Sequence, residues 1–270
     1  MSFAGTLVCV HAHPDDEAIF TSGLTLHYAE QGYRVMLVTC TAGQLGIDPS
    51  GLAGNQPGHD DDATRIARAG ELQRAATLVG YSRIVNLGFL DSGMRGWPQN
   101  SDPRAFVNAD PEAVSTTLAA LFDEVGATVV VTYDENGFYR HPDHIQTNVV
   151  TRMAVAKSRT VERLYYPVMP ESVLNAFRDG AAAAGLELPA FFMEAVEGVA
   201  DEDVEIKLNV RRFAATKQQS IAAHATQIDN ANLMTLDLGV FEMAFGAEYY
   251  LRGWERRPVP GDGQSLFANL

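Results

Sequence analysis

Two short segments of this 270-residue chain concentrate side chains that bind metals. The first is HAHPDDE, residues 11–17, and the second is YRHPDH, residues 139–144. His13 and Asp16 offer one nitrogen and one oxygen from a single turn, and His144 offers a second nitrogen. Two histidines and one carboxylate would leave the fourth position of a tetrahedral zinc ion open for water, as in catalytic zinc sites.

Other residues of the two segments suit hydrolytic chemistry. Asp15 adjoins Asp16 but should point elsewhere, because neighbouring side chains diverge on a turn. A carboxylate beside the metal is placed to take a proton from activated water. His141 is a candidate donor to the oxyanion of a tetrahedral intermediate, with Tyr139 as a second candidate. Asp143 or another acid would hold His141 protonated.

Each segment taken alone can also be explained as helix capping. Acidic residues at a helix start suit the macrodipole without any chemistry, and Asp15 or Asp16 would cap the next helix. Two clusters, both at strand-to-helix junctions, are harder to explain this way, because histidine is a poor capping residue. The metal hypothesis is therefore preferred, with His11 interpreted as structural and His27 and His59 as surface residues.

Apolar runs before each segment define the elements that must position them. Residues 6–10 and 34–41 are expected to be buried strands joined by a helix over 17–30, which opens the chain as a right-handed β-α-β unit. The pattern predicts further strands over 83–87, 128–132 and 163–168. It predicts helices over 64–79, 142–157, 171–184 and 210–225, and one that begins at residue 110. The segment 241–252 could be either helix or strand.

This alternation predicts an α/β fold, a Rossmann-like three-layer arrangement with a mostly parallel sheet flanked by helices. The metal site is expected at the C-terminal ends of the strands, where an open parallel sheet forms its crevice. Residues 1–170 would form the core that carries the site. Residues 171–270 would form an extension or small subdomain, or continue the same domain. Gly- and Pro-containing loops over 42–62 and 91–108 are long enough to suggest function.

Composition excludes some partners. The formal net charge is −14, which disfavours nucleic acid and anionic membrane surfaces. No apolar run approaches the ~20 residues of a membrane span, and no signal peptide is visible, so a cytoplasmic location is expected. Cys9 and Cys40 lie in apolar runs and are expected to be buried free thiols.

At these residues the chain resembles the LmbE/PIG-L family of zinc-dependent N-deacetylases, whose two signature segments match HAHPDDE and YRHPDH. It further resembles the mycothiol-pathway branch, which acts on N-acetylglucosaminyl-inositol. The segments that carry this closer resemblance are RAGEL (68–72), DSGM (91–94), FVNADP (106–111), VVVTYDENG (129–137) and AAHATQ (222–227).

The resemblance implies roles residue by residue. It implies one zinc ion per chain on His13, Asp16 and His144, with Fe²⁺ as an alternative metal, and Asp15 as general base. His141 is implied as the electrophilic or acid group, and Tyr139 as an oxyanion and substrate contact. Arg68 and Asp91 match positions that hold sugar hydroxyls, where paired donors and acceptors suit a diol.

Three positions depart from relatives. Gln44-Leu45 replaces a usually acidic loop sequence, which removes negative charge near the substrate. Ala18-Ile19-Phe20 lacks the lysine of the branch that cleaves mycothiol S-conjugates, which argues against that branch. Phe138 replaces one glycine of a Gly-Gly pair and is expected to narrow the pocket or stack on a sugar.

The predicted function is zinc-dependent removal of an acetyl group from an N-acetylglucosaminide, a small-molecule substrate, with the oligomeric state open. Alternatives are the same chemistry on another amide, such as an acylated antibiotic sugar or a mycothiol conjugate. A non-haem iron enzyme also uses two histidines and one carboxylate. A nucleotide- or sugar-binding protein without catalysis is disfavoured, because the first β-α turn lacks a glycine-rich phosphate cradle and places acids where phosphates would lie. The segment His224-Ala225-Thr226-Gln227 is expected to line or support the site.

Overall fold

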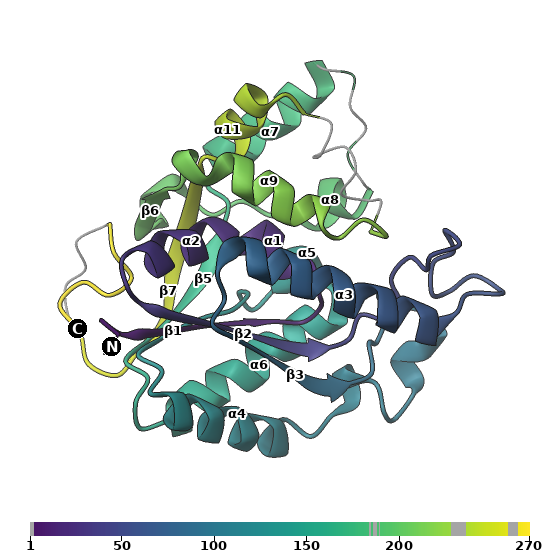
Figure 1. Ribbon diagram of the computed structural model, residues 1–270, viewed down its shortest axis with the longest axis horizontal. Coiled ribbons are helices and arrows are strands. Elements are labelled where there is room, and N and C mark those ends of the chain that lie inside the picture. The colour runs from purple at the N-terminus through teal and green to yellow at the C-terminus, as the bar shows by residue number, and fades with distance from the viewer. Residues whose placement is uncertain (1–2, 184, 186–187, 189, 228–235, 259–263) are drawn as a thin grey trace.

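A seven-stranded sheet with strand order β3-β2-β1-β4-β5-β7-β6 forms the centre of the molecule (Figure 1). The computed structural model describes residues 3–183, 185, 188, 190–227, 236–258 and 264–270. Strands β1 to β5 pair in parallel, whereas β7 pairs antiparallel with both β5 and β6. The strands are β1 Thr6–His11, β2 Arg34–Thr41, β3 Arg83–Phe89, β4 Val129–Val131, β5 Arg163–Val168, β6 Ile206–Asn209 and β7 Ala247–Glu255.

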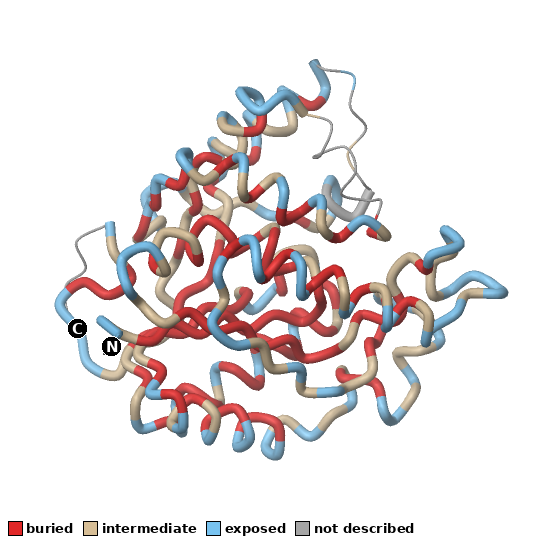
Figure 2. The backbone as a smooth tube through the Cα atoms, in the orientation of Figure 1, coloured by how far each residue is buried: buried red, intermediate tan, exposed pale blue. Residues whose placement is uncertain are grey.

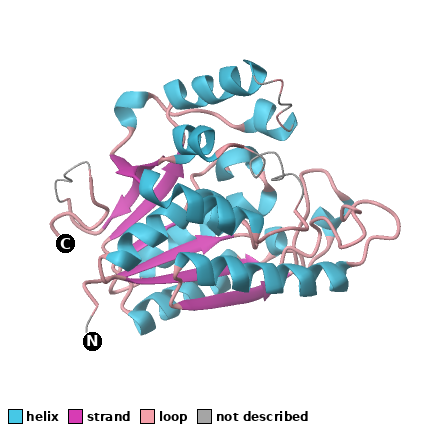
Figure 3. Ribbon diagram, turned by 45° about the horizontal axis from the view of Figure 1, so that its top comes forward, coloured by secondary structure: helices cyan, strands magenta, loops and turns pink. Residues whose placement is uncertain are grey.

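Helices cover both faces of the sheet, so the predicted three-layer α/β architecture is confirmed (Figure 3). The helices described are α1 Asp16–Phe20, α2 Ser22–Glu30, α3 Asp61–Val79, α4 Pro111–Val125, α5 Gly137–Arg140, α6 Pro142–Lys157, α7 Glu171–Ala183, α8 Ala190–Ala195, α9 Ala214–Ala222 and α11 Leu238–Phe245. Short 3-10 turns are η1 Pro98–Ser101, η2 Phe106–Asn108, η3 Asp201–Asp203 and η4 Arg211–Phe213.

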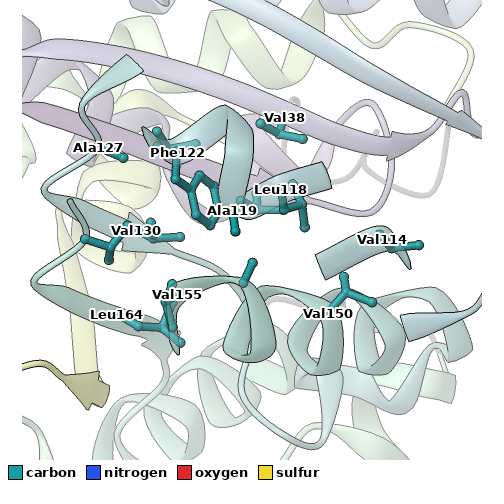
Figure 4. Packing of buried hydrophobic residues seen from close by; sticks show 14 of the residues in the cluster. Val38, Val114, Leu118, Ala119, Phe122, Ala127, Val130, Val150, Val155 and Leu164 are labelled. Atoms are coloured by element: carbon teal, nitrogen blue, oxygen red, sulfur yellow. The ribbon is translucent and has the colours of Figure 1, made fainter. Parts of the chain in front are cut away.

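Alternation along the central strand β1 distributes its side chains between two cores. Val8 and Val10 pack with α4 and α6 on one face, and Leu7 and Cys9 pack with α2 and α3 on the other. Phe122 of α4 belongs to the first of these cores (Figure 4). Because β1 is buried on both faces (Figure 2), it carries a continuous apolar run, which is the pattern of a parallel central strand.

Helix ends follow local signals in the sequence. The Asp110 side chain accepts the Glu112 amide at the start of α4, and Pro111 occupies the first helical position. Gly80 and Gly126 end α3 and α4 in the left-handed conformation, as expected of helix C-caps.

Two predicted helices differ in the structure. The helix expected over 17–30 is broken at Thr21, whose hydroxyl lies 2.8 Å from Nε2 of the buried His11. The helix expected over 210–225 begins as a 3-10 turn and becomes α-helical only from Ala214. The ambiguous segment 241–252 contains both states, because α11 ends at Phe245 and β7 starts at Ala247. Residue 184, the last of the predicted 171–184 helix, lies outside the described residues.

The region after residue 170 contributes to the same sheet as the region before it, because β7 pairs with β5 over six residue pairs. Within the described ranges, every helix is too short or too polar to cross a bilayer. Cys9 and Cys40 are buried free thiols, as expected, and burial raises the pKa of each to about 12.

Candidate metal centre

A cavity of about 920 Å³ opens where β1 and β4 end. One part of its wall consists of residues from the two segments singled out in the sequence: His13, Asp15, Asp16, Phe138, Tyr139 and His141. Arg68 and Asp91, predicted to contact the sugar, line the same cavity. The topology therefore brings together residues that are more than 120 positions apart in the chain.

The carboxylate of Asp16 lies between the two histidines expected to share a metal with it. Its Oδ2 is 3.5 Å from Nδ1 of His13, and its Oδ1 is 3.4 Å from Nε2 of His144. The backbone N–H of His13 donates to the same Oδ2 at 2.8 Å, which fixes the carboxylate. All three residues are buried. The Asp16 carboxylate thus lies within 3.5 Å of one ring nitrogen of each histidine.

Hydrogen bonds on the far side of each ring orient the two histidines. His144 Nδ1 lies 3.2 Å from the carbonyl oxygen of Gly137, so Nδ1 carries the proton and Nε2 presents a lone pair to Asp16. His13 Nε2 lies 3.1 Å from Oδ2 of Asp143, so Nε2 is the protonated atom there. The ring of Tyr133 stacks on His144 with centroids 4.0 Å apart and restricts its rotation.

This donor set fits a divalent metal ion. A neutral His144 would aim a nitrogen lone pair at a carboxylate oxygen, and that arrangement is repulsive unless a cation or proton lies between them. Burial lowers the pKa of His144 to about 3, which disfavours the proton. Metal-bound histidines commonly donate their other ring N–H to a carboxylate or a backbone carbonyl, and both partners are present here.

Other nearby groups are also spaced for a metal. Within the described part of the chain, ligand atoms of His13, His141 and His144 lie within 4.8 Å of one another, as do those of His13, Asp91 and Asp143. The two groups share His13. The second group needs no metal to account for its spacing. The protonated Nε2 of His13 lies between the carboxylates of Asp143 and Asp91, at 3.1 and 3.7 Å.

Asp143 does not hold His141 protonated, contrary to the expectation from sequence. Its carboxylate faces His13 and accepts hydrogen bonds from the backbone N–H (2.9 Å) and hydroxyl of Ser92. His141 instead caps helix α6, and its Nδ1 accepts the backbone N–H of Asp143 at 3.1 Å. Burial, and then the neighbouring His13 and His144, lower the pKa of His141 to about 3. His141 is therefore neutral, with its proton on Nε2.

Asp15 points away from Asp16, as the divergence of adjacent side chains predicts. Its Oδ1 lies 3.1 Å from Nη2 of Arg68. The same Nη2 donates to the carbonyl oxygen of Pro14, and Nη1 donates to that of Gly43. Burial raises the pKa of Asp15 to about 6, although the charge of Arg68 opposes the shift. Arg68 is itself buried, so it is not the exposed helix charge that its sequence position alone would suggest.

Tyr139 and Phe138 lie beside the centre on a distorted turn. The Tyr139 hydroxyl is 3.4 Å from Nε2 of His144. Phe138 has a φ of 63° and packs edge-on against Phe20, with ring centroids 4.8 Å apart. Both side chains line the cavity.

The loop that contains Gln44 and Leu45 also reaches the cavity. Leu45 lines it and donates its backbone N–H to Oδ2 of Asp91 at 3.4 Å, whereas Gln44 is buried. His59, expected at the surface, has a side chain only 3% exposed. Its Nε2 lies 2.9 Å from the carbonyl oxygen of Gly46, because the loop folds back over it. His59 therefore supports the loop.

Sequence reasoning missed the roles of two buried residues behind the centre. Glu17 is one of the acidic residues that a helix start favours without any chemistry, yet it is completely buried and lies 2.7 Å from Nε2 of His224. Ser92, inside the DSGM segment, donates to Asp143. The position of Glu17 inside the first signature segment was a usable signal. The contact with His224 could not be predicted, because the two residues are 207 positions apart in the sequence.

Fold and site together define an α/β protein with a two-histidine, one-carboxylate centre at the ends of its parallel strands. The chain belongs to the PIG-L family, whose profile, described as GlcNAc-PI de-N-acetylase, matches residues 8–155.

One curated relative agrees with this family assignment, and two solved structures share the fold. The 1D-myo-inositol 2-acetamido-2-deoxy-alpha-D-glucopyranoside deacetylase of Acidothermus cellulolyticus is 38% identical over 98% of this chain and 95% of its own length. The N,N'-diacetylchitobiose deacetylase of Pyrococcus horikoshii shares the fold, with a TM-score of 0.57 at 18% identity over 92% of this chain and 83% of that one. The 4-carboxy-2-hydroxymuconate hydratase GalB of Pseudomonas putida also shares the fold. Its TM-score is 0.59 at 15% identity, over 95% of this chain and 99% of that one. The fold therefore does not fix the reaction, which must be argued from the site.

Proposed function

We propose that this chain is a metal-dependent amidohydrolase that removes the acetyl group from an N-acetylglucosaminide, with N-acetylglucosaminyl-inositol as the first substrate to test. The observation that carries the proposal is the carboxylate of Asp16, set between His13 and His144 at 3.5 and 3.4 Å in the wall of a large cavity. The named activity of the 38% identical relative supports the choice of substrate.

His13 through Nδ1, Asp16, and His144 through Nε2 would hold the metal. Two nitrogens and one carboxylate oxygen suit Zn²⁺, and Fe²⁺ is the alternative that such a set also accepts. Zinc in a site of this kind supplies Lewis-acid chemistry, because it lowers the pKa of water and polarises a carbonyl oxygen.

Asp15 is the proposed general base. It lines the same cavity as His13 and Asp16, and its pKa of about 6 allows it to be ionised at neutral pH and still accept a proton. Arg68 holds the carboxylate in place. The same carboxyl group, once protonated, would deliver the proton to the leaving amine.

His141 and Tyr139 are the proposed donors to the oxyanion. Because Nδ1 of His141 accepts a backbone N–H, its Nε2–H is the group available for donation. A neutral donor of this kind stabilises developing negative charge without giving up its proton in the ground state. Arg68 and Asp91 are proposed to contact sugar hydroxyls, and Phe138 to limit the width of the pocket.

A cytoplasmic location and a small amino-sugar substrate complete the proposal, with the oligomeric state left open. The net charge of −14 supports the exclusion of nucleic acid and anionic membrane surfaces.

The test is metal analysis of purified protein together with amine release from N-acetylglucosaminyl-inositol, diacetylchitobiose and free N-acetylglucosamine. Stoichiometric zinc, with release of amine from at least one of these sugars and loss of release in His144→Ala, is the expected result. Zinc without release from any of them would contradict the substrate class. Oxygen consumption by the iron-loaded protein would instead identify the non-haem iron alternative.

A further inference from the structure

The backbone of Asp15 is held in an unusual conformation. Its φ is 110° and its ψ is −30°, a region that side-chain-bearing residues rarely occupy. Such a conformation persists only where surrounding contacts fix it, and it is commonly found at functional sites. Asp15 O accepts the amides of Ala18 and Ile19 at 3.0 and 3.2 Å, which ties the residue to the start of α1.

The other contact to this backbone comes from Glu17. Its Oε2 accepts the Asp15 N–H at 2.9 Å, so the carboxylate of one residue fixes the peptide of the residue two positions earlier. Oε1 of the same carboxylate lies 2.7 Å from Nε2 of His224, and both side chains are completely buried. A buried carboxylate is stable only with such a partner, because an unpaired one would pay the full cost of desolvation.

His224 is itself anchored to the elements that surround Asp15. It follows α9, which lies against α1 and α3 (Figure 1). Two residues further on, Thr226 donates its backbone N–H and hydroxyl to the carboxylate of Glu71, on the same helix as Arg68. Gln227 exchanges hydrogen bonds with the backbone of Ile47 at 3.3 and 3.2 Å.

We propose that Glu17 and His224 are positioning residues for catalysis: His224 fixes Glu17, and Glu17 fixes the backbone of Asp15, so that the Asp15 carboxylate faces the reacting water. Arg68 restrains the other end of the same residue. The region after residue 170 thus contributes a buried side chain that supports the proposed base from behind. The inference rests on the proposed function, because it assigns a partner to the proposed base.

Replacement of His224 by leucine tests the inference in solution. His224→Leu is expected to lower kcat about 100-fold, the effect of misplacing a catalytic group by about 1 Å, with little change in KM or zinc content. His224→Gln, whose amide can still donate to Glu17, is expected to recover most of kcat. The matched control is His27→Leu, because His27 contacts Gln31 at the surface and should have no effect.

A second comparison separates positioning from general support. If His224 acts through Asp15, the double variant Asp15→Asn/His224→Leu retains the kcat of Asp15→Asn alone. A further loss equal to that of the single His224→Leu change would overturn the proposal. Should the leucine variant fail to fold, His224→Asn takes its place, because its shorter polar side chain does not reach Glu17.

A crystal structure of the His224 variant provides a readout that needs no activity. The expected result is a changed φ at Asp15 and loss of the Glu17 contact. An Asp15 that keeps its φ near 110° and its bond to Glu17 overturns the inference. If the wild-type chain deacetylates no sugar, the proposed function fails, but this structural comparison still decides whether His224 fixes Asp15.

Discussion

Nε2 of His13 lies 3.1 Å from Oδ2 of Asp143, although 130 positions separate the two residues. Ser92, from a third loop, donates two hydrogen bonds to the same carboxylate. The contact leaves Nδ1 of His13 directed at Asp16. Against the effect of burial, Asp91 and Asp143 also raise the pKa of His13 well above its usual range.

Asp143→Asn should weaken zinc binding about 10- to 100-fold, because partners that orient a metal-bound histidine typically contribute that much to affinity. Competition with a chromophoric chelator measures the dissociation constant. The matched control is Asp62→Asn on the exposed face of α3. An unchanged zinc affinity in Asp143→Asn would show that the contact does not orient His13 for the metal.

Asp15→Asn should lower kcat at least about 100-fold, because a positioned general base typically contributes 10²- to 10⁴-fold. Zinc content should stay at the wild-type level, because Asp15 points toward Arg68 and away from Asp16. Steady-state release of amine, paired with metal analysis of the same sample, checks both statements. Near-normal kcat with zinc bound would remove Asp15 from the role of base.

His141→Ala should lower kcat about 100- to 1000-fold with a much smaller effect on KM, as expected when a donor to the oxyanion is removed. The variant also removes the cap of α6, so His141→Asn, which retains a capping side chain, is the more informative change. If both variants raise KM and leave kcat unaltered, His141 contributes to substrate binding and not to the oxyanion.

Stability should depend on pH through Asp123. Its carboxylate accepts hydrogen bonds from the Ser158 hydroxyl and the Arg159 backbone and pairs with the Arg159 side chain. Burial alone would raise the pKa of Asp123, but these contacts together outweigh it and lower the pKa to about 2 from an ordinary 3.8. The folded state therefore favours the charged form. The resulting stabilisation is complete above pH ~4 and is lost as the pH falls toward 2.

Asp123→Asn should accordingly reduce the free energy of unfolding by about 1 kcal/mol at neutral pH, since Arg159 is 86% exposed and solvent screens its pairing with Asp123. The difference between wild type and variant should shrink as the pH is lowered from 4 to about 2. Urea unfolding at several pH values measures it. A difference that stays constant with pH would mean that the charge of Asp123 does not stabilise the fold.

Local patterns were sufficient to predict much of the framework. The helix at 142–157 and the strand at 163–168 agree with the structure residue for residue, because proline at the first helical position and a compact apolar run mark their limits. The break at Thr21 could not be read from the sequence, since it depends on a hydrogen bond to His11 that only the folded chain provides.

In the site, too, some contacts could be predicted from the sequence and others depend on the folded chain. Convergence of His13, Asp16 and His144 follows from their positions after parallel strands. The partner of Asp143 was mistaken, because proximity in sequence suggested His141 whereas the cap geometry of α6 directs the carboxylate to His13. The contact of Glu17 with His224 spans 207 positions and has no local signature.

The most direct test of the central claim is titration of metal-free protein with zinc while acetate release from N-acetylglucosaminyl-inositol is followed. The account predicts no release without metal and a linear rise in rate that ends at one zinc per chain, with His144→Ala inactive throughout. Full activity of the metal-free protein, or one bound zinc without acetate release, would contradict it.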